Sequence, residues 1–145
     1  MKVCCGIVAL LVAWLAMGPK STGAIEGVAQ AQSGIKSKED RIALGKPLYV
    51  SCTACHQPEG QGVPPVFPPL ARSDFLNADK KRTIQIVTQG WHGEMVVNGV
   101  KYNTNMPSIR LTDEEVANVL TYVYGSFGNS GLLVTPEEVK SQRGW

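Results

Sequence analysis

The sequence predicts a mostly α-helical fold that carries one small β-hairpin. Apolar side chains recur at helical spacing in three stretches, near residues 37–52, 80–89 and 112–125. Each stretch opens at or just after a Ser, Thr or Asp, the residues that cap helix N-termini. The exception lies near residues 95–102, where Asn98-Gly99 separates short apolar runs and predicts a type I′ hairpin turn.

The N-terminal stretch predicts an export signal. Lys2 supplies a positive charge, and residues 3–17 are apolar but short of the roughly 20 residues that a membrane span needs. Small residues then offer a cleavage site after Ala24, with Ala31 as the alternative, and an uncleaved anchor stays open. We therefore expect a signal peptide over residues 1–24.

A linker over residues 25–36 is expected to precede the folded domain, which spans residues 37–145. The first helix of this domain begins after Ser37, whose hydroxyl can cap the first turn. Pro47 has no amide hydrogen, so it predicts a kink or a restart of this helix. Gly45 has no side chain, which predicts that another helix approaches closely there.

The most specific pattern in the chain is Cys52-Thr53-Ala54-Cys55-His56. This Cys-x-x-Cys-His motif indicates covalent attachment of a c-type haem, because each thiol can bond one vinyl group of the same porphyrin. His56 would then be the proximal iron ligand. A zinc site would need a second ligand pair, and no cysteine follows Cys55. A thioredoxin-type pair has no use for the histidine, and a structural disulfide is the remaining alternative.

Residues 57–69 predict an irregular loop around the cofactor, because Gly60 and Gly62 permit tight turns and four prolines stiffen the chain. A ligating histidine needs a partner for its other ring nitrogen, and the carbonyl of Pro68 is the predicted acceptor. Leu70 is then expected to lie against the porphyrin. The alternative for Pro68 is that it only forms a turn.

Four further helical segments are predicted after this loop. A single turn over residues 73–77 precedes the helix over residues 80–89. A longer helix with an apolar stripe begins at the capping box of Thr112 and ends at Gly125. It is expected to cross the first helix near the glycine of that helix. A short final helix begins after Thr135, with proline at its first position.

A second iron ligand is predicted at Met106, in a segment expected to be a loop and followed by Pro107. A His/Met pair raises the reduction potential of haem, because a thioether stabilises ferrous iron better than a second imidazole does. Met95 and His92 stay open as alternatives. Met95 stands at the start of a predicted strand, where a packing role is commoner, and His92 would give bis-histidine ligation.

These motifs together resemble class I cytochromes c, over a segment from about residue 42 to residue 124. A narrower likeness is to the cytochrome c domain fused to some copper-containing nitrite reductases and to small c subunits of periplasmic dehydrogenases. The strings that carry it are Cys52–Pro58, Phe67–Leu70, Val97–Val100, Tyr102-Asn103, Met106-Pro107 and Asn118–Val123. The resemblance implies an all-α class I cytochrome c fold around one covalent haem c. It also implies axial ligation by the matching histidine and methionine.

The expected function is electron transfer and not enzymatic catalysis, since His56 and Met106 would fill both axial positions of the iron. An exported carrier would act in the periplasm, between a donor and a terminal reductase or oxidase. A copper-containing nitrite reductase would be a separate partner, because this chain carries no cupredoxin domain. Such partners would dock transiently at the haem edge, which residues 63–67 and the stretch around Met106 are expected to frame.

Two other functions stay open at this point. One is a cytochrome subunit that is permanently bound in a dehydrogenase or reductase complex. The other is a gas sensor or haem enzyme with a labile sixth ligand. No nucleic-acid partner is expected. The chain has 14 basic and 12 acidic residues, and the basic ones form no stripe along the sequence. No membrane span is expected in the mature chain.

Overall fold

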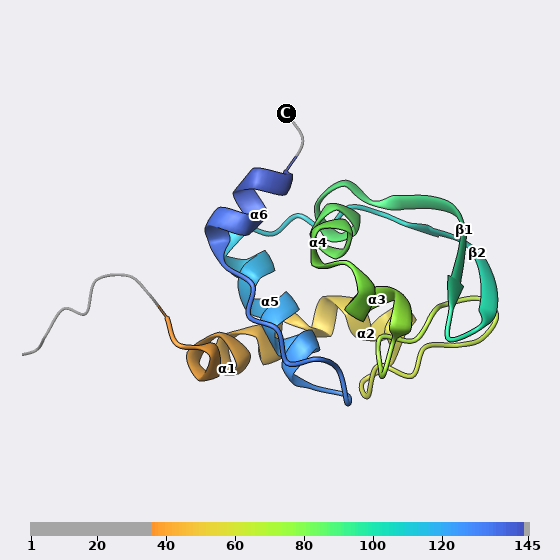
Figure 1. Ribbon diagram of the computed structural model, residues 1–145, viewed down its shortest axis with the longest axis horizontal. Coiled ribbons are helices and arrows are strands. Elements are labelled where there is room, and N and C mark those ends of the chain that lie inside the picture. The colour runs from red at the N-terminus through yellow and green to blue at the C-terminus, as the bar shows by residue number, and fades with distance from the viewer. Residues whose placement is uncertain (1–35, 144–145) are drawn as a thin grey trace, which may run out of the picture. The chain divides into compact units, whose positions relative to one another are not determined.

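The computed structural model describes residues 36–143, which form six helices and one two-stranded antiparallel sheet (Figure 1). The predicted signal peptide and nearly all of the predicted linker lie outside these residues. No helix within residues 36–143 is long and apolar enough to cross a membrane. The elements in chain order are α1 (Lys38–Leu48), α2 (Val50–His56), α3 (Asp74–Ala78), α4 (Lys80–Gln89), β1 (Trp91–Val97), β2 (Val100–Met106), α5 (Asp113–Gly125) and α6 (Pro136–Gln142).

Helix α1 begins where the sequence predicts, because Ser37 and Asp40 cap each other. The Ser37 hydroxyl accepts a hydrogen bond from the Asp40 amide at 3.1 Å, and the Asp40 carboxylate accepts one from the Ser37 amide at 3.1 Å. Pro47 lies in the last turn of α1, and the chain leaves the helix at Tyr49 before α2 begins at Val50. The helix restart predicted from Pro47 is confirmed.

Helices α1 and α5 cross at Gly45. A Cβ atom at this position would lie 2.1 Å from the carbonyl oxygen of Asn118, so a side chain would force the two helices apart. Tyr49 lies one turn further along the same face, where its ring packs against Tyr122 with centroids 5.5 Å apart. The crossing and the close approach predicted from the glycine are both confirmed.

Helix α5 is the centre of the fold and contacts α1, α4 and α6 (Figure 1). The sequence predicts one apolar stripe on this helix, but the structure also buries its Asn118 and Thr121. Asn118 Oδ1 accepts a hydrogen bond at 2.9 Å from the guanidinium of Arg41, itself only 4% exposed. Thr121 Oγ1 accepts one at 3.0 Å from the Val134 amide. The buried polar groups of α5 therefore have partners on the elements that cover it.

The hairpin is longer than predicted, and the prediction that Met106 lies in a loop is wrong. Strands β1 and β2 pair along their whole length from Trp91 to Met106, so Met106 ends a strand and does not lie in a loop. The predicted turn is confirmed, since φ is 51° at Asn98 and 79° at Gly99. Residues 103–105 are Asn, Thr and Asn and give no apolar alternation, so backbone pairing extends this strand without a side-chain signal.

Candidate cofactor site

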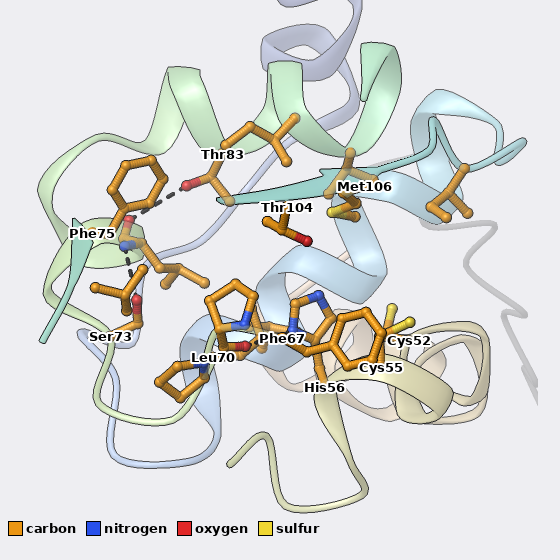
Figure 2. Close-up of a pocket in the computed structure, with 18 of the residues that line it drawn as sticks. Cys52, Cys55, His56, Phe67, Leu70, Ser73, Phe75, Thr83, Thr104 and Met106 are labelled. Atoms are coloured by element: carbon orange, nitrogen blue, oxygen red, sulfur yellow. Dashed lines mark hydrogen bonds between the residues drawn. The ribbon is translucent and has the colours of Figure 1, made fainter. Parts of the chain in front are cut away.

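An open, apolar cavity lies between α2, the loop that follows it, α3, α4, the hairpin and α5 (Figure 2). The aliphatic residues of its lining include Leu70, Leu76, Ile86, Val87, Val119 and Leu120. Apolar walls of this extent favour a ligand with a large apolar surface, because the ligand removes them from water.

Helix α2 brings Cys52, Cys55 and His56 to one end of this cavity. These positions are three and four residues apart, a spacing that puts side chains on one face of a helix, and all three line the cavity. The two thiols are free and are not joined in a disulfide. His56 is buried and Cys55 is exposed, so this end of the cavity opens to solvent beside Cys55.

His56 is oriented by the loop that follows it. Its Nδ1 lies 2.9 Å from the carbonyl oxygen of Pro68, and because a carbonyl can only accept, Nδ1 carries the proton. Burial lowers the pKa of His56, and the Pro68 hydrogen bond partly opposes this effect. The imidazole is therefore held neutral with Nε2 unprotonated, which is the form that binds a metal.

The thiol of Cys52 does not have the properties of a redox-active cysteine. Burial, followed by the neighbouring Cys55, raises the pKa of Cys52 to about 11. Thioredoxin-type cysteines work as thiolates and need a lowered pKa. The structure therefore argues against thiol–disulfide exchange at this motif.

The hairpin forms the opposite wall. Directly opposed residues of an antiparallel pair share a face, and the register pairs Trp91 with Met106 and Met95 with Tyr102. Met95 and Met106 both line the cavity, and Figure 2 shows Met106 across the cavity from His56. His92 is exposed on the other face of β1 and does not line the cavity.

The fold thus brings together the residues predicted as a site from sequence. Cys52, Cys55, His56, Pro68, Leu70 and Met106 all line this one cavity. The donor set fits a covalently attached haem. It comprises two thiols at one end of the cavity, an imidazole on one wall and a thioether on the other. Within residues 36–143 no group of three or more His, Cys, Asp or Glu side chains could instead hold a bare metal ion.

Comparison with known families agrees with this donor set. The family model described as Cytochrome c matches residues 42–126. The chain belongs to the cytochrome c family. The match takes in the Cys-x-x-Cys-His motif, the hairpin and α5, and it leaves residues 127–143 beyond its end.

Curated relatives of this cytochrome c include cytochromes c-552 and a dehydrogenase subunit. Cytochrome c-552 from Thermus thermophilus is 38% identical over 111 residues, which cover 70% of this chain and 85% of that protein. Cytochrome c-552 from a second strain of Thermus thermophilus is likewise 38% identical over 111 residues, which cover 75% of its length. The gluconate 2-dehydrogenase cytochrome c subunit from Pantoea cypripedii is 34% identical over 113 residues, covering 73% of this chain and 25% of that protein.

Membership of the family carries two consequences for this cytochrome c. Its cofactor is covalently bound haem c. Proteins of this family carry electrons to and from redox partners and are not enzymes.

Sequence reasoning missed the part of the cavity that α3 and α4 supply. Phe75 and Thr83 both line it, and the guanidinium carbon of Arg82 lies 3.7 Å from the centroid of the Phe75 ring. Arg82 Nε is buried without a hydrogen-bond partner among the described residues. Helical spacing predicts both helices, but which side chains face a cofactor depends on how the helices pack against the hairpin.

Proposed function

We propose that this cytochrome c is an exported carrier of single electrons that holds one haem. In this proposal Cys52 and Cys55 attach the haem by thioether bonds, and His56 and Met106 are its axial ligands. The observation that carries the proposal is that these four side chains line one apolar cavity, with the imidazole and the thioether on opposite walls. Pro68 and Leu70 complete the wall on the His56 side.

The protein's own groups account for a carrier function. Bound haem c supplies an iron that alternates between its ferric and ferrous states. His56 is held through Pro68, and this hydrogen bond makes the imidazole a stronger donor through Nε2. The thioether of Met106 favours the ferrous state and raises the reduction potential. If His56 and Met106 both held the iron, no ligand position would be left for a substrate.

Two observations favour Met106 over Met95 as the sixth ligand. The backbone of Met106 is held closely, since a Cβ on Gly90 would lie 2.8 Å from the Met106 carbonyl oxygen. Met95 is 9% exposed and belongs to a small apolar cluster with Val97 and Tyr102, which already accounts for its burial. His92 points away from the cavity, so bis-histidine ligation finds no support.

The surface beside Cys55 suits transient docking. The loop next to it exposes Val63 by 41% and Val66 by 53%, and an antiparallel bridge joins Val63 to the cavity-lining Phe67. Electron-transfer complexes use small contact areas, which lets partners separate after each transfer. We infer that donor and acceptor proteins meet this rim, the acceptor being a terminal reductase or oxidase. A copper-containing nitrite reductase is one candidate, from the sequence resemblance.

A permanently bound cytochrome subunit is the second candidate. It is favoured by the 34% identity to the cytochrome c subunit of gluconate 2-dehydrogenase, of which this chain covers 25%. The two functions differ in what the protein is bound to when it is isolated.

The test is isolation of the full chain from the periplasmic fraction of an expressing bacterium. We expect a haem-stained band on a denaturing gel, an intact mass for a chain cleaved after Ala24 or Ala31, and elution as a small protein on gel filtration. Stable co-elution with a larger subunit would favour the second candidate. A mass that retains residues 1–17 would contradict cleavage and indicate an anchor.

A further inference from the structure

Asn129 lies beyond the end of the cytochrome c match, in the segment that returns from α5 toward α6. Its side-chain amide makes four hydrogen bonds. Oδ1 accepts from the Ser73 amide at 3.3 Å and from Asn77 Nδ2 at 3.1 Å. Nδ2 donates to the carbonyl oxygens of Leu70 at 2.9 Å and Val123 at 3.0 Å. These bonds use the full capacity of the amide, and their donors and acceptors allow only one orientation of it.

Three of the four hydrogen-bond partners of Asn129 stand in the walls of the haem cavity. Leu70, Ser73 and Val123 all line the cavity, and Asn129 does not. These three residues come from the loop after α2, the N-cap of α3 and the last turns of α5. One side chain outside the cavity therefore joins three separate parts of its wall.

A short run of backbone connects the Asn129 hydrogen bond at Leu70 to the proposed iron ligand His56. The Leu70 carbonyl held by Asn129 lies two residues after the Pro68 carbonyl that bonds His56. The Leu70 amide donates to the Gly60 carbonyl at 2.7 Å, so both sides of this residue are fixed. Proline at 68 and 69 restricts φ, so a displacement at Leu70 is passed on to Pro68 with little absorbed between them.

A second contact joins the same two segments beside Asn129, through two residues with an uncommon backbone conformation. Arg72 and Phe127 both have positive φ, 48° and 57°, which non-glycine residues rarely adopt. The Arg72 amide donates to the Phe127 carbonyl at 3.1 Å, so the two residues meet each other. Such conformations persist where the surrounding structure imposes them and often lie near functional sites.

We propose that Asn129 is a positioning residue for the haem site. It holds Leu70 and Ser73 in place and, through Leu70, keeps the Pro68 carbonyl on His56 Nδ1. This inference rests on the proposed function, because it assumes that His56 ligates the iron. Its chemical consequence is an imidazole of fixed orientation and fixed donor strength.

The test compares Asn129→Ala with Thr121→Val in the haem-loaded protein. Thr121 also bonds the returning segment, through the Val134 amide and carbonyl, but neither residue lines the cavity. The readouts are the solvent exchange rate of the His56 Nδ1 proton by NMR, the reduction potential, and the denaturation midpoint. Both variants are expected to lose stability.

Only Asn129→Ala is expected to change the haem site. Exchange of the Nδ1 proton should be about tenfold faster, the factor expected when a hydrogen bond of ordinary strength is no longer held. The reduction potential should rise, because a weaker bond to Pro68 makes the imidazole a poorer donor to ferric iron. Should Asn129→Ala not accumulate, Asn129→Ser serves in its place, with the same expected direction.

Equal effects of the two variants on exchange, or an Asn129 variant that alters stability alone, would overturn the inference. Suppose the wild type binds haem in a six-coordinate state, and the Asn129 variant has the same Nδ1 exchange rate and reduction potential as the wild type. That result refutes this positioning role only. A wild type without covalent haem refutes the proposed function as well, so the two failures are distinguishable.

Discussion

The two walls of the haem cavity are built in different ways. The helix-loop wall consists of α2 and residues 57–70, and its hydrogen bonds are numerous and local. His56 bonds Pro68 at 2.9 Å, and Tyr49 donates to the Gln57 carbonyl at 2.8 Å. The hairpin wall consists of β1 and β2, and its buried residues form a cluster separate from the main core.

The hairpin wall is attached to the rest of the fold at few points. The Asp74 amide donates to Asn98 Oδ1 at 3.0 Å, and the Asn98 amide donates to Asp74 Oδ1 at 2.7 Å. The Phe75 ring packs edge-on against the Trp91 ring, with their centroids 6.0 Å apart. A wall with fewer buried contacts opens locally at lower free-energy cost. The comparison teaches that the proposed ligand His56 stands on the wall with more hydrogen bonds. Met106 stands at the end of the hairpin where its backbone lies against Gly90, and the tip at Asn98 is the part of the hairpin with few attachments.

The largest effect is expected from removing the covalent anchor of the helix-loop wall. Cys52→Ala combined with Cys55→Ala should abolish covalent haem, because within residues 36–143 no other thiol remains. The measurement is haem staining of a denaturing gel. A stained band from the double variant would contradict the attachment sites, and the unaltered protein is the control.

The next effect concerns the ligand of the hairpin wall. Met106→Ala should open the iron to water or carbon monoxide, and Met106→His should keep a low-spin iron but lower the reduction potential, because imidazole favours the ferric state. The matched control is Met95→Ala, which should cost only packing, about 2–5 kcal/mol of unfolding free energy. Reduction potential and carbon monoxide binding, measured on all three variants, decide whether Met106 or Met95 is the ligand. The assignment is reversed if the Met95 variant alters both and the Met106 variants alter neither.

A smaller effect tests the support behind the helix-loop wall. Gly45→Ala should lower the free energy of unfolding by about 3 kcal/mol, since its Cβ would lie 2.1 Å from the Asn118 carbonyl oxygen and the helices must separate. Lys46→Ala, at the next and exposed position of α1, is the control. Denaturant titration measures both. Similar unfolding free energies for the two variants would show that the crossing is not tight.

The smallest effect sharpens the difference between the walls. Asp74→Ala removes the carboxylate that accepts from the Asn98 amide, and should lower the unfolding free energy by only about 1 kcal/mol. It should nevertheless speed carbon monoxide binding to the ferrous protein, because the hairpin is freed locally. Asp74→Asn keeps an acceptor oxygen and should behave more like the wild type. Unchanged binding in Asp74→Ala would mean that this pair does not restrain the hairpin wall.

Much of this fold could be predicted because the decisive interactions are short in sequence. The cap of Ser37 on Asp40 spans three residues, the hairpin turn needs only Asn98 and Gly99, and one helix face collects Cys52, Cys55 and His56. The glycine of α1 predicted a helix crossing because only a missing side chain permits so close an approach. The sequence by itself therefore determined the helices, the hairpin turn and the candidate haem motif.

Only the tertiary structure decided the features that join distant residues. Backbone pairing carried β2 through Asn103 to Met106, where no side-chain alternation marked a strand. The buried Arg41 found its partner 77 residues away at Asn118. Asn129 meets Leu70 across 59 residues. Local propensity contains no information about such contacts, because which partner a polar side chain meets depends on how the helices have packed.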